Sequence, residues 1–238
     1  MKAEDIKKEL AKYIIPEKAT FLPKFFKTQK GGEGDVFIGV TVPDQRKTAK
    51  KFLDLELTEI KKLLYSKVHE YRLTALIILV LRFKKAFKLN DTGEQKKIYD
   101  FYLKNKSQVN NWDLVDMSAH YIVGNYVYHN NLERKILYDL ARSKNLWEQR
   151  IAIIATFYFI VNNELDDTYR IADILLNHKH DLIHKAVGWM LREAGKRDRK
   201  SEEQFLRSRY KKMPRTMLRY AIEKFEETKR KKYLKGEI

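Results

Sequence analysis

A tryptophan and an aspartate, Trp112 and Asp116, have the residue types and the spacing that could do chemistry. If this stretch is helical, side chains four residues apart lie on the same face. The indole offers a flat surface that attracts cations, and an ionised carboxylate accepts hydrogen bonds without donating any. The pair could therefore stabilise positive charge, although a buried tryptophan beside a surface aspartate is the simpler alternative.

Two further tryptophans, Trp147 and Trp189, are each followed three residues later by an arginine, Arg150 and Arg192. We interpret Trp147 as packing between helices and leave it out of the candidate site. Arg150 could pair with Glu148 or cap a neighbouring turn, or it could hold a phosphate group.

The chain is strongly basic, with 49 Lys and Arg against 32 Asp and Glu and a net charge of +17. This charge favours a polyanionic partner or an anionic membrane surface. The absence of cysteine excludes disulfides, thiolate metal sites and cysteine nucleophiles. The charged residues 1–5 do not resemble a signal peptide, and the longest apolar run, 151–161, is shorter than the roughly 20 residues that span a bilayer. We expect a soluble, cytoplasmic protein with no membrane partner.

Sequence motifs for metal or cofactor chemistry are weak. His180 and His184 loosely resemble a zinc-protease pattern with Asp in place of Glu, but the stretch straddles a predicted helix start. The glycines at 31–34 lack the Lys-Ser/Thr of a phosphate-binding loop and are interpreted as a plain connector. We therefore expect no metal and no cofactor, which leaves carboxylates near aromatic rings and arginines.

Apolar residues recur at spacings of three and four, and Gly (9) and Pro (4) are few, which indicates an all-α protein. The predicted helices are 3–13, 19–27 with a kink at Pro23, 43–52, 57–66, 69–87, 92–106, 112–127, 131–143, 147–162, 168–177, 181–196, 201–211 and 214–230. No Pro- or Ser-rich linker divides them. We expect one domain over 1–238, with N-terminal helices in 1–30 and a solvated basic tail at 228–238.

A weak internal repeat predicts how these helices stack. Glu70-Tyr71-Arg72-Leu73 and Glu148-Gln149-Arg150-Ile151 begin similar helices 78 residues apart, which is two periods of 39. Helix pairs that repeat at about 40 residues are typical of a HEAT-like α-solenoid, which has one curved concave face. The runs 73–81 and 151–160 are apolar nearly all round, which predicts inner, doubly covered helices.

The remaining candidates suit a substrate that is itself positively charged. A purine alkylated at N3 or N7 is cationic, so its glycosidic bond is weakened and the base leaves without a general acid. A carboxylate can stabilise the developing oxocarbenium ion and orient water. Aromatic faces attract the cationic base, and arginines hold the flanking phosphates.

Four segments in order, 110–116, 146–153, 184–193 and 213–221, are similar to motifs of the AlkD family of alkylpurine DNA glycosylases. Phe37-Ile38-Gly39-Val40, followed by Pro43 and Arg46, resembles the N-terminal signature of that family, and the likeness covers about residues 35–225. It implies a HEAT-like superhelix that cradles duplex DNA in a concave basic face. It also implies excision of cationic N3- and N7-alkylpurines without a metal and without flipping the base into a pocket.

The resemblance also implies roles for individual residues. The catalytic set of the family falls on Trp112, Asp116, Trp189 and Arg150, none of which is substituted. Apart from the resemblance, we expect four further cations to contact DNA: Arg192, Lys185, Lys196 and Arg46. The first three lie near Trp189 in the sequence, and an ordinary solvated charge is the alternative for each of them.

The expected partner is double-stranded DNA containing alkylated purines, bound by a monomer. Two other classes stay open, a non-catalytic HEAT-repeat protein that binds branched or damaged DNA and a scaffold that binds proteins. Strand cleavage through a lysine Schiff base also stays open, because lysine is frequent throughout the chain. Asp113 and Glu193 are interpreted as structural residues near helix starts or in ion pairs.

Overall fold

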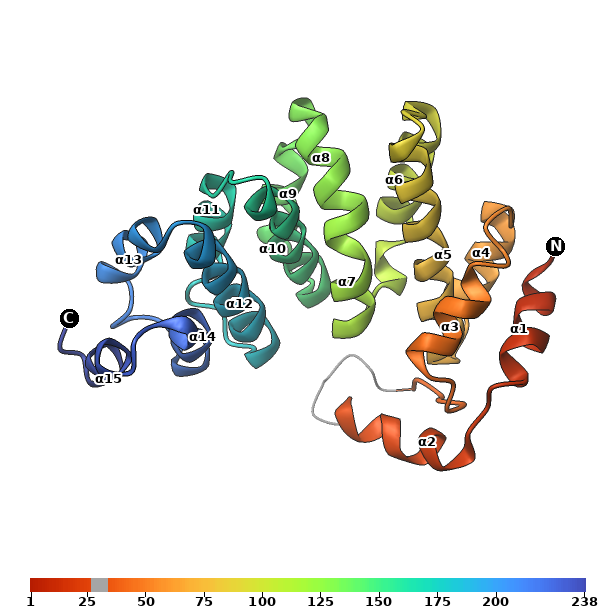
Figure 1. Cartoon of the computed structure of the whole chain (residues 1–238), viewed down its shortest axis with the longest axis horizontal. Coiled ribbons are helices and arrows are strands. Elements are labelled where there is room, and N and C mark those ends of the chain that lie inside the picture. The colour runs from red at the N-terminus through yellow and green to blue at the C-terminus, as the bar shows by residue number, and fades with distance from the viewer. Residues whose placement is uncertain (27–33) are drawn as a thin grey trace. The chain divides into compact units, whose positions relative to one another are not determined.

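Two compact units make up the chain. The computed structural model describes residues 1–26 and 34–238, and residue contacts divide the chain into Met1–Ser118 and Ala119–Ile238 (Figure 1). In the described ranges every regular element is helical, apart from an isolated bridge between Val36 and Val68. The predicted all-α class is therefore confirmed. Of the glycine connector predicted at 31–34, Gly34 alone lies within the described residues.

Helices of the first unit pack mainly on their neighbours in the chain. The elements are α1 (Ala3–Ala11), α2 (Pro16–Phe21), η1 (Leu22–Phe25), α3 (Val42–Ala49), α4 (Leu57–Leu64), α5 (His69–Lys88), α6 (Thr92–Lys104), η2 (Lys106–Gln108) and α7 (Trp112–Ala119). α1 packs on α3 and α4, both of these pack on α5, and α5 packs on α6. Residues 73–80 of α5 are all buried, as predicted for an inner helix.

The second unit shows the same serial packing. Its elements are η3 (His120–Gly124), α8 (Asn125–His129), η4 (Asn131–Glu133), α9 (Lys135–Ala141), α10 (Leu146–Val161), α11 (Asp166–Ile174), α12 (Asp181–Arg197), α13 (Arg199–Arg207), α14 (Arg215–Ala221), η5 (Ile222–Lys224) and α15 (Glu227–Lys235). α9 packs on α10, α10 on α12 and α12 on α14. Serial stacking of this kind is the organisation of an α-solenoid, and α10 is its most apolar helix, with residues 150–156 buried.

Two of the predicted helices are not α-helical throughout, because each contains a short segment of 3-10 or π-helix. Pro23 lies in η1, where α2 tightens into a 3-10 helix, in agreement with the predicted kink. The helix predicted at 112–127 is present, but α7 continues through a π-helical segment, η3, into α8. π-helical turns are rare and often occur at functional sites. No helix in the described ranges has both the length and the apolar character needed to cross a bilayer.

The stretch predicted as one helix at 214–230 is two helices, so that prediction is wrong. Between α14 and α15 the backbone of Phe225 is extended. Its ring packs edge-on against Tyr233, and the guanidinium of Arg199 lies 4.1 Å from the ring centre. Burial of this aromatic side chain outweighs the local helical periodicity at the break.

The basic tail predicted at 228–238 is mostly helical, and its basic run 229–232 is half-buried or exposed, in agreement with a solvated charge run. α15 buries Tyr233, which is 1% exposed. Lys229 forms an ion pair with Glu203 of α13, while Lys231 remains largely exposed. One buried aromatic residue therefore docks the tail onto the second unit.

Glu202 of α13 is a carboxyl group buried in the second unit. It packs against the backbone of Gly195, and no hydrogen-bond partner of its Oε1 is present among the described residues. Burial raises the pKa of Glu202 to about 8, although attraction to Arg199 opposes this shift. The group is therefore mainly protonated at neutral pH.

Replacing Glu202 with Gln should stabilise the protein at alkaline pH. The pKa is about 8 in the folded chain against an ordinary 4.5, so wild-type stability falls as the pH rises between these values. Glutamine has a similar shape and cannot ionise. E202Q should therefore melt at a higher temperature than the wild type at about pH 9 and at a similar temperature near pH 5.

Thermal unfolding followed by circular dichroism at both pH values measures this difference. The matched control is Glu17→Gln at an exposed position, which should follow the wild type throughout. Equal melting temperatures for E202Q and wild type at the alkaline pH would contradict the assignment.

Candidate active site

Trp112 and Asp116 lie on one face of α7, as their spacing predicts. The opposite face buries Leu114, Val115 and Ser118 completely, whereas Trp112 and Asp116 are half-buried. The periodicity of the helix therefore presents an indole and a carboxylate along the same partly open surface.

The first turn of α7 is held by a buried histidine of α5. The Nε2 atom of His69 lies 2.7 Å from Oδ2 of Asp113, and the other carboxylate oxygen of Asp113 accepts the backbone N–H of Leu114 at 2.8 Å. Asn111 accepts the backbone N–H of Trp112 at 2.8 Å. Asp113 thus lies at a helix start and in an ion pair, as predicted.

His69 contacts a second carboxylate through its other ring nitrogen. Nδ1 lies 2.9 Å from Oδ2 of Asp35, and the remaining oxygen of Asp35 pairs with Arg72. Arg72 also donates to the main-chain carbonyl of Gln108, at 2.8 Å, four residues before α7. Side chains of α5 therefore hold both the segment that precedes α3 and the segment that leads into α7.

Electrostatics keep this histidine charged. Burial alone would lower the pKa of His69, but hydrogen bonds to Asp113 and Asp35 outweigh it and raise the pKa to about 9. Burial likewise acts to raise the pKa of Asp35, but the hydrogen bond to His69 and the attraction to Arg72 lower it. At neutral pH the network is two carboxylates, one imidazolium and one guanidinium.

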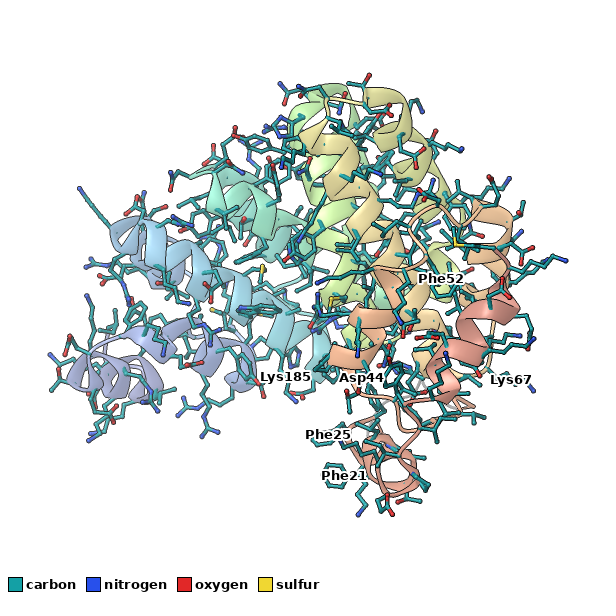
Figure 2. The ribbon with its side chains drawn as sticks, turned by 45° about the vertical axis from the view of Figure 1, so that its right-hand side comes forward. Phe21, Phe25, Asp44, Phe52, Lys67 and Lys185 are labelled. Carbon is teal, nitrogen blue, oxygen red and sulfur yellow. The ribbon has the colours of Figure 1, made fainter. Side chains whose placement is uncertain are left out.

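An aromatic stack connects this network to Trp112. The ring of Phe26 stacks on Trp112 with centroids 5.5 Å apart and on Phe37 at 5.0 Å, and Phe37 stacks on His69 at 4.7 Å. Phe21 and Phe25, in contrast, are 51% and 56% exposed and point away from the unit (Figure 2). Of Phe21, Phe25 and Phe26, Phe26 is the one that stacks on Trp112.

The N-terminal signature segment is bound by the same turn of α5. The Glu70 carboxylate accepts the backbone N–H of Ile38 at 3.1 Å and that of Gly39 at 2.8 Å. Gly39 has a φ of +83°, and a Cβ there would lie 2.1 Å from the carbonyl oxygen of Ile15. Only glycine fits this position.

Arg46 extends from α3 to α7. Its Nη2 lies 3.0 Å from the sulfur of Met117, the residue after Asp116. Its contact is a neutral thioether, and no carboxylate pairs with it among the described residues. The first unit therefore contains Trp112, Asp116 and one exposed cation beside α7.

In the second unit, four candidates share one face of α12. Lys185, Trp189, Arg192 and Lys196 follow at spacings of four, three and four, and all are half-buried or exposed. The opposite face is buried against α10 and α14. The ring of Trp189 lies 6.3 Å from that of Phe157, which in turn contacts His120 of η3 at 5.5 Å.

The cations on this face have acidic partners. Lys185 pairs with Asp181 at 2.7 Å, Lys196 pairs with Glu193 at 2.7 Å, and Arg192 pairs with Glu193 at 3.2 Å and also with Glu223. The interpretation of Glu193 as an ion-pair residue is confirmed. A DNA phosphate that binds one of these cations would take the place of its carboxylate partner.

Arg150 is buried, with 4% exposed surface, and its Nη1 donates to the main-chain carbonyl of Leu182 at 2.6 Å. Leu182 lies in the first turn of α12. Arg150 of α10 thus contacts the first turn of α12. Trp147 is 6% exposed, which agrees with packing between helices.

The two histidines of the zinc-protease-like pattern make local contacts. His180 is the N-cap of α12, and its Nδ1 accepts the backbone N–H of Leu182 at 3.2 Å. His184 donates from Nε2 to the carbonyl of His178 at 2.5 Å. Each ring thus organises the loop before α12.

The family model of DNA alkylation repair enzymes matches residues 6–225, nearly the whole chain. The chain belongs to this family. A solved structure described as a predicted DNA alkylation repair enzyme from Enterococcus faecalis has the same fold, with a TM-score of 0.70 at 18% identity over 89% of this chain and 96% of that one. No curated protein matches the sequence. As a member of this family, the chain has DNA as its partner.

Several residues that organise the repair enzyme were missed by sequence reasoning. His69, Asp35, Arg72 and Phe26 hold α7, but they come from three separate segments of the chain. A signal for one of them was present, since Arg72 belongs to the motif Glu70-Tyr71-Arg72-Leu73, whose counterpart in the repeat contains Arg150.

Gly188 sets the position of Trp189 in the repair enzyme. A Cβ at Gly188 would lie 2.5 Å from both the carbonyl oxygen of Met217 and the Cβ of Tyr220. Gly188→Ala should therefore push α12 from α14 and destabilise the fold by about 1–3 kcal/mol. Chemical denaturation followed by circular dichroism measures this loss.

The matched control is Gly93→Ala in α6, where an added Cβ meets only Asp91 Oδ1, at 3.5 Å. It should leave stability unchanged or raise it by up to about 1 kcal/mol, because alanine favours helix. If G188A were as stable as G93A, the close approach of α12 and α14 would not depend on glycine.

Proposed function

We propose that this protein is a monofunctional DNA glycosylase that hydrolyses the N-glycosidic bond of cationic N3- and N7-alkylated purines in duplex DNA. The observation that carries the proposal is the half-buried pair of Trp112 and Asp116 on one face of α7, in a family of DNA alkylation repair enzymes.

The chemistry follows from the charge of the substrate. When the bond between C1′ and the purine breaks, the base keeps the electron pair and leaves as a neutral molecule, so no acid is required. Positive charge then develops on the deoxyribose, where the Asp116 carboxylate stabilises it and orients the attacking water. The water oxygen bonds to C1′, and its proton passes to the carboxylate or to solvent.

The other candidates bind rather than react. Trp112 and Trp189 contact the cationic base and the sugar by their faces. Arg150 and Arg192 hold the DNA backbone beside the lesion, with Arg150 of α10 acting from a buried position next to the first turn of α12. Contact with the lesion in the stacked duplex, without base flipping, is part of the same proposal.

Lys185, Lys196 and Arg46 supply further contacts to phosphate, supported by the net charge of +17. The enzyme acts as a monomer on double-stranded DNA and needs no cofactor in this proposal. The alternative is a non-catalytic protein of the same fold that binds branched or damaged DNA, which would bind methylated duplex tightly and release no base.

Asp116→Asn should abolish most of the activity. The amide keeps the size of the side chain but removes the negative charge that opposes the oxocarbenium ion. Release of 7-methylguanine from methylated duplex should fall by roughly 10²- to 10³-fold, measured by chromatography of the freed bases.

Asp139→Asn, at an exposed position of α9 that pairs with Lys135, is the matched control and should retain wild-type release. Near-full activity of D116N would rule out the role given to Asp116.

Arg46→Gln should weaken DNA binding in a salt-dependent way. Arg46 is exposed, and in the described part of the chain its side chain bonds the Met117 sulfur. Binding a phosphate would therefore not require Arg46 to break an ion pair with a carboxylate. Loss of one phosphate contact should reduce the slope of log affinity against log salt by about 0.9. Fluorescence anisotropy with plain duplex over a range of salt concentrations measures the slope.

Lys96→Gln on α6, where Lys96 pairs with Asp100, provides the comparison and should leave the slope unchanged. An unaltered slope for R46Q would show that Arg46 does not contact phosphate.

A further inference from the structure

We propose that His69 is a positioning residue of the candidate active site: as a doubly protonated ring between Asp35 and Asp113, it holds the first turn of α7 and with it Trp112 and Asp116. The effect on catalysis rests on the proposed function, whereas the effect on Trp112 does not.

The geometry requires the charged form of the ring. Both nitrogens of His69 face a carboxylate oxygen, at 2.9 Å for Asp35 and 2.7 Å for Asp113. A neutral imidazole has one N–H donor and one lone pair, so one of the two carboxylates would then face a lone pair. The imidazolium donates a hydrogen bond to both carboxylates. The His69 side chain is only 3% exposed to solvent.

Every element packed around the ring contributes a group to this arrangement. Asp35 comes from the segment before α3, Asp113 from α7, and Arg72 from the next turn of α5. Glu70, on the same helix as His69, is occupied by the backbone N–H groups of 38–39. Phe37 and Phe26 cover the ring. Two negative and two positive charges therefore balance within the network.

Loss of the His69 proton would weaken the contacts that hold Trp112 and Asp116 of α7 in place. Asp113 accepts the backbone N–H of Leu114 and bonds His69 at the same time, so it connects the start of α7 to α5. Without the bond to His69, the first turn of α7 keeps the Asn111 contact to Trp112, the contact of Asp113 to Leu114 and the stacking of Phe26 on Trp112. Trp112 is in that turn, and Asp116 is in the next one. The Phe26 ring, which touches both His69 and Trp112, transmits the same change.

His69→Gln should slow the reaction without weakening DNA binding, because His69 is buried and does not touch the substrate. The single-turnover rate of 7-methylguanine release should fall at least about tenfold, as misplacement of catalytic groups does, while the dissociation constant for methylated duplex stays within about twofold. The wild-type rate should decline above about pH 9, where His69 loses its proton, and H69Q should show no such decline.

Asp113→Asn provides a second variant that keeps the side-chain shape. Removing one of the two negative charges lowers the pKa of His69, so the alkaline decline of D113N should begin at a lower pH than in the wild type. His129→Gln, an exposed histidine of the second unit, is the matched control and should keep both the rate and the pH profile. Enzyme-free samples at each pH correct for alkaline damage to the methylated bases.

Fluorine NMR of the protein labelled with 5-fluorotryptophan separates this inference from the proposed function. The Trp112 resonance, assigned with Trp112→Phe, should shift with a midpoint near pH 9 in the wild type and should not shift in H69Q. If the wild type released no base but the resonance shifted, the proposed function would fail and the positioning role would stand. A Trp112 resonance that is constant through this pH range, or an unchanged rate for H69Q, would overturn the inference.

Discussion

A buried imidazolium bonded to two carboxylates is the constraint on which the candidate residues of the first unit depend. His69 begins the central helix α5 and joins Asp35, before α3, to Asp113, in the first turn of α7. Buried ion pairs contribute little net stability, because desolvation offsets their attraction. Their contribution here is to geometry: with Arg72 included, one arrangement satisfies all four charges, and that arrangement sets where α7 begins.

The second unit uses a related contact at the equivalent place in the repeat. Arg72 and Arg150 occupy matching positions, 78 residues apart in the sequence. Each is buried and donates to a main-chain carbonyl close to the start of a helix that contains a tryptophan, through Gln108 for α7 and Leu182 for α12. A serial helical fold repeats local contacts from one unit to the next. The helices that contain Trp112 and Trp189 are therefore held by the same kind of bond.

Helical periodicity made most of the fold predictable, since α5 and α10 bury the apolar runs that the pattern marks. Spacing alone also placed Trp112 and Asp116 on a common face. The contacts of His69 were not predictable, because its partners lie 34 and 44 residues away in the chain. The break at Phe225 was missed for a similar reason: tertiary burial of one ring decides it, and local pattern does not record such burial.

The proposed function requires that this family member breaks a glycosidic bond rather than only binding damaged DNA. The most direct measurement is chromatography of the bases that the purified protein releases from methylated duplex DNA. A monofunctional glycosylase should release free 7-methylguanine and 3-methyladenine and leave abasic sites in an otherwise intact strand. Tight binding to the same duplex with no base above the enzyme-free background would contradict it.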